Sequence, residues 1–280
     1  ILRGNITALG QGITLIESTL PEDEKKGQNL LADCLPKIGN SIRIGITGVP
    51  GVGKSTFIET FGKLLTSQGK KVAVLAIDPT SVRTQGSILG DKSRMHELSA
   101  DKNVFIRPSP SSGTLGGVSN KTRESIILCE AAGFEIILIE TVGVGQSETT
   151  VNNLVDFFLL LMLAGAGDEL QGIKRGIMEL ADALVITKAD GDNSQKAKNA
   201  ALEYKRALHL FPAMENGWTP KVSTCSALEN KGVAEIFETI NKFNTQMISS
   251  SWKIKNRNDQ NNYWLHLKAK EELGNKKYNS

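Results

Sequence analysis

The sequence predicts an α/β fold with a mainly parallel central sheet flanked by helices. Two observations predict it. From Ser41 onwards, short apolar segments alternate with helix-compatible segments, which is typical of a parallel sheet with crossover helices. Within this region the segment 45–56, GITGVPGVGKST, fits the phosphate-loop pattern GxxxxGK[ST], and an apolar run precedes it while a helix-compatible run follows. The strand–loop–helix context indicates a P-loop NTPase.

The expected elements follow the chain in order. Residues 1–40 are expected to be helical, because Ile6, Leu9, Ile13 and Ile16 recur at helical spacing. The strands are expected at Ile42–Thr47, Val72–Ile77, Val104–Arg107, Ile136–Glu140, Phe157–Leu163, Ala183–Thr187 and Val222–Cys225. The helices between them are expected at Lys54–Leu65, Lys92–Ser99, Lys121–Ala131, Ser194–Leu208 and Val233–Phe243.

The chain is expected to have three parts. Residues 1–40 form a helical N-terminal extension, because they carry no strand pattern. Residues 41–246 form the nucleotide-binding domain, and residues 247–280 form a C-terminal tail with a helical portion. Loops that follow strand carboxyl ends are where ligands bind in such sheets, so we look for the site there.

The C-terminal tail suggests a contact between subunits. It is polar over 253–262 and resumes a helical pattern at Tyr263. A tail of this kind, which bears tryptophans and does not look able to bury itself, fits a dimerisation arm. Trp252, Trp264 and Leu265 are the candidates for its contact surface. We therefore expect a homodimer, with a frayed tail as the alternative.

Composition limits the partners and the compartment. The chain of 280 residues carries 33 basic and 30 acidic residues, a net charge of +3, and this near balance does not argue for nucleic acid or an anionic membrane. No apolar run reaches the roughly 18 residues of a membrane span. The three cysteines are isolated, which favours a reducing compartment. No secretory signal is evident, so we expect the cytoplasm in a bacterium or the mitochondrial matrix in a eukaryote.

The residue types of the phosphate loop suit a bound phosphate. Glycines let consecutive backbone N–H groups converge on a phosphate, and the N-terminus of the following helix adds partial positive charge. Lys54 is expected to reach the β- and γ-phosphates, and the Ser55 hydroxyl is expected to bind Mg²⁺. The expected nucleotide contacts in this loop are Gly48, Val49, Pro50, Gly51, Val52, Gly53, Lys54, Ser55 and Thr56.

Acidic residues after two other strands suit a magnesium site. The fourth expected strand ends in Glu140, and Gly143 follows it with an N–H that would bind the γ-phosphate. Asp78 follows the second strand and Asp91 lies in the next loop, where either would bind the metal or position the attacking water. The expected Mg²⁺ ligands are Ser55, Asp78, Asp91 and Glu140.

A loop after the sixth expected strand resembles NKxD, the motif that reads guanine. Asp190 would accept two hydrogen bonds that guanine supplies and adenine does not, and the stem of Lys188 would cover the base. Thr187 stands where Asn is usual, and its hydroxyl keeps only part of the bonding of an amide. We therefore expect guanine preference with reduced affinity. The loop expected to back the guanine carbonyl consists of Ser226, Ala227 and Leu228.

Four longer strings resemble the MeaB/ArgK/MMAA family of SIMIBI-class P-loop GTPases. The resemblance covers about residues 1–245, and Thr187 and Gln85 depart from the family pattern. The strings are IDPTS at 77–81, GSILGDK at 86–92, ETVGVGQSE at 140–148 and GAGDELQGIK at 165–174.

The resemblance implies a function and a partner. It implies a G-protein chaperone that uses GTP hydrolysis to gate adenosylcobalamin loading and to protect or reactivate methylmalonyl-CoA mutase or a related acyl-CoA mutase. GTP or GDP and Mg²⁺ would be its ligands. It also implies a third switch loop over 165–176. The residues expected to switch or to contact the partner there are Asp168, Glu169, Gln171, Lys174 and Arg175.

Hydrolysis is expected to be slow. Water would attack the γ-phosphate in line, and GTPases without a supplied arginine turn over on the order of 10⁻⁴ s⁻¹. Gln146 is a candidate for orienting that water. Three alternatives remain open: a metallochaperone-type GTPase, although the histidines are scattered; an ATPase or kinase linked to amino-acid transport, an older label of the family; and a module that binds nucleotide without hydrolysis.

Overall fold

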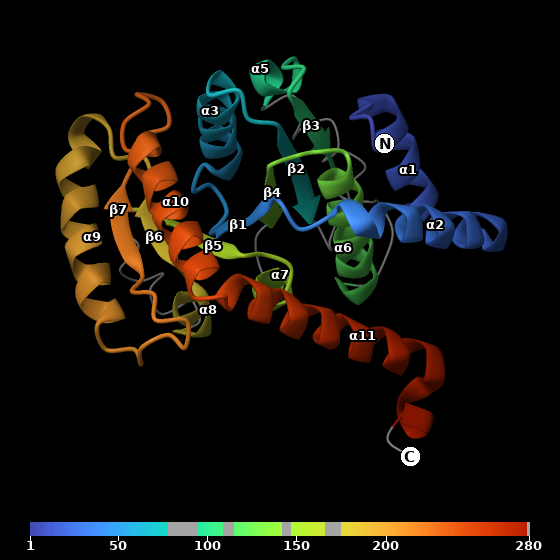
Figure 1. Cartoon of the computed structure of the whole chain (residues 1–280). Coiled ribbons are helices and arrows are strands. Elements are labelled where there is room, and N and C mark those ends of the chain that lie inside the picture. The colour runs from blue at the N-terminus through green and yellow to red at the C-terminus, as the bar shows by residue number, and fades with distance from the viewer. Residues whose placement is uncertain (78–94, 109–114, 142–146, 166–174, 279–280) are drawn as a thin grey trace.

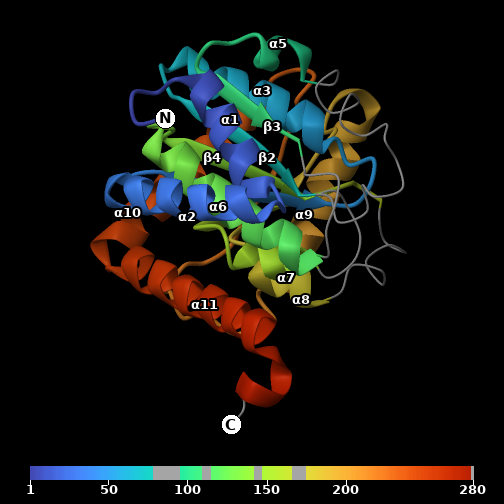
Figure 2. The same ribbon diagram turned by 90° about the vertical axis from the view of Figure 1, so that its right-hand side faces the viewer.

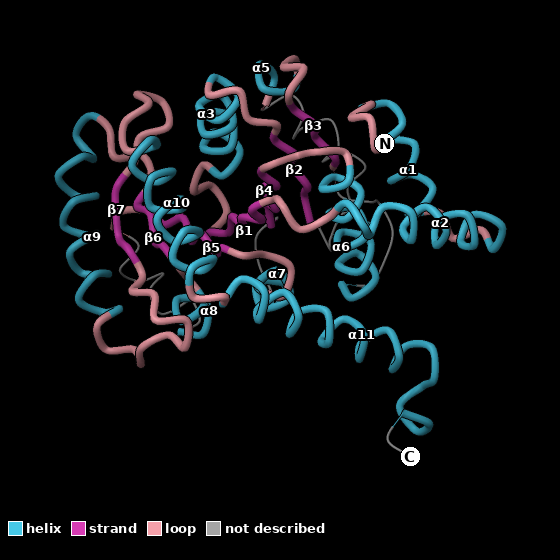
Figure 3. Tube along the Cα trace, in the orientation of Figure 1, coloured by secondary structure: helices cyan, strands magenta, loops and turns pink. Residues whose placement is uncertain are grey.

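A central sheet covered by helices on both faces forms the body of the protein (Figure 1). The computed structural model describes residues 1–77, 95–108, 115–141, 147–165 and 175–278. Within these residues the expected α/β fold with a parallel sheet is confirmed. The helical character of the N-terminal region and of the C-terminal region is also observed, because helices both precede and follow the sheet (Figure 3).

The described strands form one parallel sheet in the order β3-β2-β4-β1-β5-β6-β7. Strand β1 lies in the middle and pairs with β4 on one side and β5 on the other. Every strand expected from the sequence is present, and each end lies within one residue of its expected position. The strands are β1 (Ile42–Gly48), β2 (Val72–Ile77), β3 (Val104–Arg107), β4 (Ile136–Thr141), β5 (Phe157–Met162), β6 (Ala183–Ile186) and β7 (Lys221–Thr224).

The helices divide between the two faces of the sheet. One apolar cluster receives side chains from α1, α2, α6, α7, α8, α9 and α11, and the other receives them from α3, α5 and α10, with Trp252 at the start of α11 packed against it. The described helices are α1 (Ile6–Glu17), α2 (Pro21–Cys34), α3 (Lys54–Ser67), α5 (His96–Ser99), α6 (Leu115–Ala131), α7 (Ser147–Asn152), α8 (Arg175–Leu180), α9 (Ser194–Leu208), α10 (Val233–Ser249) and α11 (Trp252–Tyr278), with short 3₁₀ turns at Leu35–Lys37 and Gly191–Asn193.

Strand β5 explains why the sheet is buried on both sides. All six of its residues are apolar and buried. Phe158 and Leu160 point into one apolar cluster, while Phe157 and Leu159 point into the other. A continuous apolar run without alternation is what a parallel strand covered on both faces requires. The run is therefore a central strand, as expected, and not a membrane segment.

Helix boundaries were predicted less well than strand boundaries. Helix α6 begins at Leu115, six residues before the expected start, and α10 continues to Ser249 instead of ending at Phe243. Of the helix expected at Lys92–Ser99, the structure describes His96–Ser99 as helical, and residues 92–94 lie outside the described part. Polar residues at helix ends obscure the apolar periodicity on which the expectation rests.

The expectation for the C-terminal tail was wrong in one respect. The polar stretch 253–262 is not an interruption, because α11 is one helix from Trp252 to Tyr278. Trp264 is only 3% exposed and packs into the core, so it is not a free contact surface, whereas Leu265 is 67% exposed. The charged residues of the stretch form ion pairs and hydrogen bonds with the body of the protein. A pattern of apolar residues cannot predict such contacts.

A buried ionic cluster attaches α11 to the amino ends of the central strands. Both nitrogens of one edge of the Arg257 guanidinium donate to the Asp156 carboxylate, at 2.8 and 2.7 Å. Arg43 of β1 donates to Glu130 at the end of α6, at 2.9 Å. Lys253 donates to the carbonyl oxygen of Ser41 at 3.0 Å. Because the side chains of Asp156 and Glu130 are 4% and 1% exposed, neither carboxylate is solvated and each depends on its cationic partner.

The charges in the cluster control its titration. Burial by itself raises the pKa of Asp156, but the hydrogen bonds and charge of Arg257 outweigh it and hold the pKa below its usual value. Burial likewise raises the pKa of Glu130, but the charge and the hydrogen bond of Arg43 oppose burial, and the pKa is lowered. A carboxyl group whose pKa is lower in the folded protein stabilises the fold above its ordinary pKa, and this contribution is lost as the pH falls through the lowered value.

Replacing Arg257 should destabilise the whole domain. We expect Arg257→Leu to lower the free energy of unfolding by about 3–5 kcal/mol at neutral pH, because it leaves two buried carboxylates without their shared cation. Urea unfolding followed by circular dichroism measures the change. Arg206→Leu, at an exposed position on α9, is the control and should have little effect. Equal unfolding midpoints for Arg257→Leu and the unmodified protein would contradict the role of the cluster.

Asp182 should make stability depend on pH in the opposite sense. Burial raises its pKa to about 7, the N–H of Phe158 bonded to its Oδ2 lowers it, and the charge of Asp156 raises it. The folded protein therefore binds more protons than the unfolded chain between about pH 4 and 7, so stability falls as the pH rises through this interval. Asp182→Asn keeps an acceptor for Phe158 and cannot ionise. We expect this variant to show a weaker dependence of melting temperature on pH between pH 5 and 8. Parallel plots of melting temperature against pH for the two proteins would exclude Asp182 as the titrating group.

Candidate nucleotide-binding site

The phosphate loop begins where β1 ends. Gly48 lies opposite Leu161 of β5, and a Cβ added at Gly48 would lie 2.4 Å from the carbonyl oxygen of Leu161, so only glycine fits. Gly53 has a φ of +94° and immediately precedes Lys54, the first residue of α3. The loop thus leads into a helix N-terminus, where N–H groups and the helix dipole favour an anion. The other predicted contacts on this loop and turn are Val49, Pro50, Gly51, Val52, Ser55 and Thr56.

The ammonium group of Lys54 lies inside the loop. Its Nζ donates to the carbonyl oxygen of Gly48 at 2.9 Å. Burial lowers the pKa of Lys54, and the negative charge of Glu140 opposes this effect. A partly desolvated cation binds phosphate oxygens more strongly than a solvated one, because charge-assisted hydrogen bonds strengthen where water is excluded.

Glu140 is brought to the same edge of the sheet by the pairing of β4 with β1. It lies opposite Ile46 of β1 and is only 4% exposed. The next residue, Thr141, donates its hydroxyl to the hydroxyl of Thr47 at 2.8 Å. These contacts tie the carboxyl ends of the two strands together, so a buried carboxylate lies next to the strand that carries the phosphate loop.

Thr187 connects the predicted base-reading loop to the phosphate loop. Its hydroxyl oxygen lies 2.7 Å from the carbonyl oxygen of Val52 and 3.2 Å from that of Met162. Thr187 is buried, and its backbone N–H also bonds to Met162. Sequence reasoning treated Thr187 only as a weakened base contact and missed this link. The residue type gave no signal of it, because the partner carbonyl is 135 residues away in the chain.

The two predicted base loops lie side by side and share hydrogen bonds. Ser226 donates its hydroxyl to Oδ2 of Asp190 at 2.6 Å, and Ala189 donates its N–H to the carbonyl of Cys225 at 3.0 Å. Thr60 of α3 donates to the carbonyl of Ala227 at 3.1 Å. The carboxylate of Asp190 is therefore held in one orientation by a loop that α3 in turn supports. Two further predicted residues take distinct places: Lys188 has a φ of +54° and its stem approaches Gly53, and Leu228 is 80% exposed.

Several predicted site residues lie outside the described part of the chain. For Arg175 the structure describes the backbone, which begins α8. The predicted roles of these residues therefore remain predictions. The residues outside the described ranges are Asp78, Asp91, Gly143, Gln146, Asp168, Glu169, Gln171 and Lys174.

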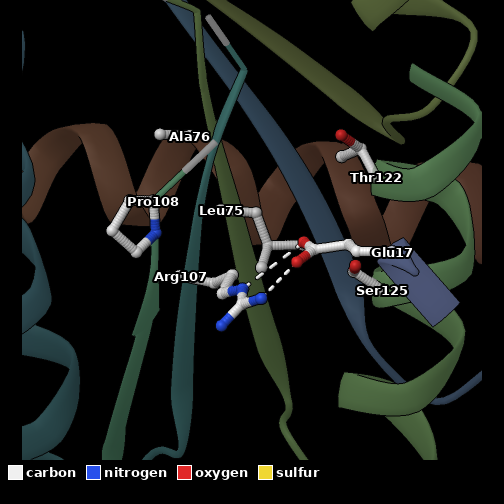
Figure 4. A pocket seen from close by; sticks show the side chains of 7 residues that line it. All are labelled: Glu17, Leu75, Ala76, Arg107, Pro108, Thr122 and Ser125. Carbon is white, nitrogen blue, oxygen red and sulfur yellow. Dashed lines mark hydrogen bonds and ion pairs between the residues drawn. The ribbon is translucent and has the colours of Figure 1, made fainter. Parts of the chain in front are cut away.

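A small polar pocket, which sequence reasoning did not predict, lies near the carboxyl ends of β2 and β3 (Figure 4). Arg107, at the end of β3, donates to the carboxylate of Glu17 at the end of α1 and to the hydroxyl of Thr14. The side chains of Thr122 and Ser125 on α6 complete the polar lining. The ion pair satisfies both charges, so the pocket ties α1 to the sheet and adds no group to the phosphate loop.

The arrangement defines a P-loop nucleotide-binding protein: a glycine-rich loop between a central strand and a helix, a half-buried lysine within it, and a second pair of loops joined to it at the same edge. Residues 9–280 match the family model described as "Methylmalonyl Co-A mutase-associated GTPase MeaB", and the chain belongs to this family. It is a GTPase, and the family relation assigns guanine nucleotide as its ligand.

Known proteins resemble the chain over nearly its whole length. GTPase ArgK of Escherichia coli is 49% identical over 273 residues, which cover 98% of this chain and 82% of that protein. The mitochondrial methylmalonic aciduria type A homolog of the mouse is 48% identical over 275 residues, covering 95% of this chain and 66% of that protein. A crystal structure described as an LAO/AO transport system kinase is 42% identical, with a TM-score of 0.84, covering 97% of this chain and 82% of that one.

No helix in the described ranges combines the length and apolar character needed to cross a bilayer. The same residues contain no group of three or more His, Cys, Asp or Glu side chains arranged to hold a metal ion.

Removing the hydroxyl that orients Asp190 should weaken guanine selectivity. We expect Ser226→Ala to reduce GTP affinity by about tenfold, the effect of losing one hydrogen bond to a charged group. The affinity for ATP, which is expected to be lower from the start, should change little. Titration with fluorescent GTP and ATP analogues measures both affinities. Ser67→Ala removes a hydroxyl bonded to Leu64 at the far end of α3 and is the control. An equal loss for the two nucleotides would mean that Ser226 does not act through the base.

Proposed function

We propose that this GTPase is a metabolic chaperone that gates adenosylcobalamin loading and protects or reactivates methylmalonyl-CoA mutase or a related acyl-CoA mutase. The observation that carries the proposal is the match to a family described as associated with that mutase, which extends over residues 9–280. The relation to a protein named for methylmalonic aciduria supports the same partner. Family membership favours this role over the metallochaperone alternative.

The nucleotide roles that we propose follow from the contacts at the carboxyl edge of the sheet. The phosphate loop and Lys54 would bind the phosphates, since both present donors to the same space. Asp190, held by Ser226, would accept hydrogen bonds from guanine. Thr187 would keep the base loop in register with the phosphate loop through Val52. In this proposal the Thr187 hydroxyl has a structural role, and guanine selectivity depends on Asp190.

The residues present fit a magnesium ion. The hydroxyl of Ser55, in the first turn of α3, and the buried carboxylate of Glu140 are oxygen donors of the kind that Mg²⁺ prefers. We propose that they hold the ion, with Asp78 and Asp91 as further ligands. When bound, Mg²⁺ would supply positive charge to the phosphate oxygens.

The chain's own groups would promote hydrolysis by position and charge. Lys54 and the N–H groups of the phosphate loop would stabilise the charge that develops on the γ-phosphate. Gly143 would donate its N–H to the same phosphate, Gln146 would orient the attacking water, and the loop containing Asp168 would respond to the nucleotide and contact the mutase. These steps are proposals that rest on the sequence motifs.

Assembly and location are also proposals. Ile254 and Leu265 on α11 are each 67% exposed, and apolar side chains of this size on a helix suit a contact between two copies of the chain. We propose a homodimer on this basis. The location would be the bacterial cytoplasm, or the mitochondrial matrix as in the relative named as mitochondrial.

Turnover assays test the proposed partner. We expect GTP hydrolysis on the order of 10⁻⁴ s⁻¹ for the protein alone, a several-fold rise with methylmalonyl-CoA mutase from the same source, and no comparable turnover of ATP. Lys54→Ala with the mutase is the control for contaminating activity, and an unrelated cobalamin enzyme is the control for the partner.

The outcomes separate the alternatives. Stimulation by the mutase alone supports the chaperone role, and the transfer of adenosylcobalamin with GTP or with a non-hydrolysable analogue then tests gating directly. An unchanged rate with the mutase would exclude this client. ATP turnover equal to GTP turnover would favour a kinase or transport-linked ATPase, the description carried by the similar crystal structure.

A further inference from the structure

The C-terminal helix α11 holds the turn between α7 and β5 by three hydrogen bonds. Gln260 donates through Nε2 to the carbonyl oxygens of Val155, at 2.7 Å, and of Asn152, at 3.3 Å. Trp264 donates through Nε1 to the carbonyl of Asn153, at 2.8 Å. Gln260 and Trp264 are 5% and 3% exposed. Figures 1 and 2 both place α11 beside α7, and the contacting residues lie in the first half of this 27-residue helix.

The α7–β5 turn and the end of α7 pack against β1, the strand that leads into the phosphate loop. Val151, the fifth residue of α7, and Val155, in the turn, are buried. A Cβ added at Gly45 of β1 would lie 3.1 Å from Cγ1 of Val151 and 3.3 Å from Cγ1 of Val155, so these side chains occupy the space that Gly45 leaves open. Gly45 lies three residues before Gly48. Cores are close-packed, and a displacement of the turn therefore displaces either α7 or β1.

The same turn is also fixed at its far end. Asp156, the residue after Val155, donates its N–H to the carbonyl of Arg43 at 2.8 Å and accepts two hydrogen bonds from Arg257 of α11. On the other side, α7 begins six residues after Thr141, the last residue of β4, which directly follows Glu140. Helix α11 thus helps to set the position of α7, which lies between β4 and β5 in the chain.

We propose that Gln260 and Trp264 are positioning residues for GTP hydrolysis, which act through the α7–β5 turn on α7 and β1. The proposed contacts to phosphate and base come from the phosphate loop and the loops after β6 and β7, whereas the hydrogen bonds of Gln260 and Trp264 go to the α7–β5 turn. The rate of the chemical step should therefore depend on these two side chains more than nucleotide binding does. The inference concerns the GTPase reaction itself and is independent of the proposed mutase partner.

A matched pair of tryptophans supplies the test. Trp264→Phe removes the donor to Asn153 and keeps an aromatic ring in the core. Trp218→Phe removes an equivalent donor, because Nε1 of Trp218 bonds to the carbonyl of Asp182 at 2.9 Å and the residue is 7% exposed. Trp218 lies beside β6 and β7 and does not contact α7. The two variants lose the same kind of buried hydrogen bond and differ in what it holds.

The expected result is a separation of kcat from KM. Trp264→Phe should lower kcat for GTP by about fivefold, the equivalent of one hydrogen bond, and change KM less than twofold. Trp218→Phe should keep kcat within about twofold of the unmodified protein, although it should lose about as much thermal stability as Trp264→Phe. Equal kcat values for the two variants would overturn the proposal, as would a change confined to KM.

A second pair and a spectroscopic signal keep the test decisive if Trp264→Phe does not fold. Gln260→Met removes the donor and keeps the side-chain length, with Gln246→Met, which loses a bond to Gly217, as its control. The sequence has three tryptophans, so Trp218→Phe with Trp252→Phe leaves Trp264 as the single fluorophore. Its emission should differ between GDP and a non-hydrolysable GTP analogue. Identical spectra, or equal kcat for the glutamine pair, would overturn the proposal.

Discussion

The placement of β1 between β4 and β5 is the constraint on which the rest of the structure depends. Strand β1 forms hydrogen bonds on both sides and is covered on both faces. At Gly48 nothing larger than hydrogen fits, and at Gly45 an added Cβ would lie only 3.1–3.3 Å from neighbouring side chains. The strand order reverses at β1, because β2, β3 and β4 lie on one side of it and β5, β6 and β7 lie on the other. In open α/β sheets ligands bind outside the carboxyl ends of the strands at such a point, and the phosphate loop follows β1 there.

The parts of the site come from distant segments and meet because parallel strands end at one edge. The loops after β6 and β7 are joined to each other through Ser226 and Asp190, and Thr187 joins them to the phosphate loop through Val52. Each of these bonds is made by a short hydroxyl side chain to a fixed partner. Short side chains lose little conformational freedom on ordering, so such bonds hold the loops in register at low entropic cost.

The opposite edge of the sheet is organised by charge. Arg43, Arg257 and Lys253 face Glu130 and Asp156 with little solvent between them, and this cluster connects β1 and α6 with the helix furthest along the chain. Buried ion pairs of this kind contribute modest net stability but strongly disfavour any arrangement that breaks them. They therefore specify where α11 lies, and with Gln260 and Trp264 they attach the C-terminal helix to the sheet and to the α7–β5 turn.

The sequence by itself determined the strands, the parallel sheet and the phosphate loop, because each is encoded locally. Six consecutive apolar residues form β5, and glycines at fixed spacing form the loop before Lys54. The base-reading roles of the motif at 187–190 and the loop at 226–228 were predicted from the same kind of local pattern, and they stay predictions. Only the tertiary structure decided what Thr187 bonds to, how Asp190 is held, and that the polar stretch 253–262 is a docked helix. Those outcomes depend on partners about 35 to 215 residues away in the chain, and no local pattern of polarity or periodicity records a hydrogen bond or ion pair over that separation.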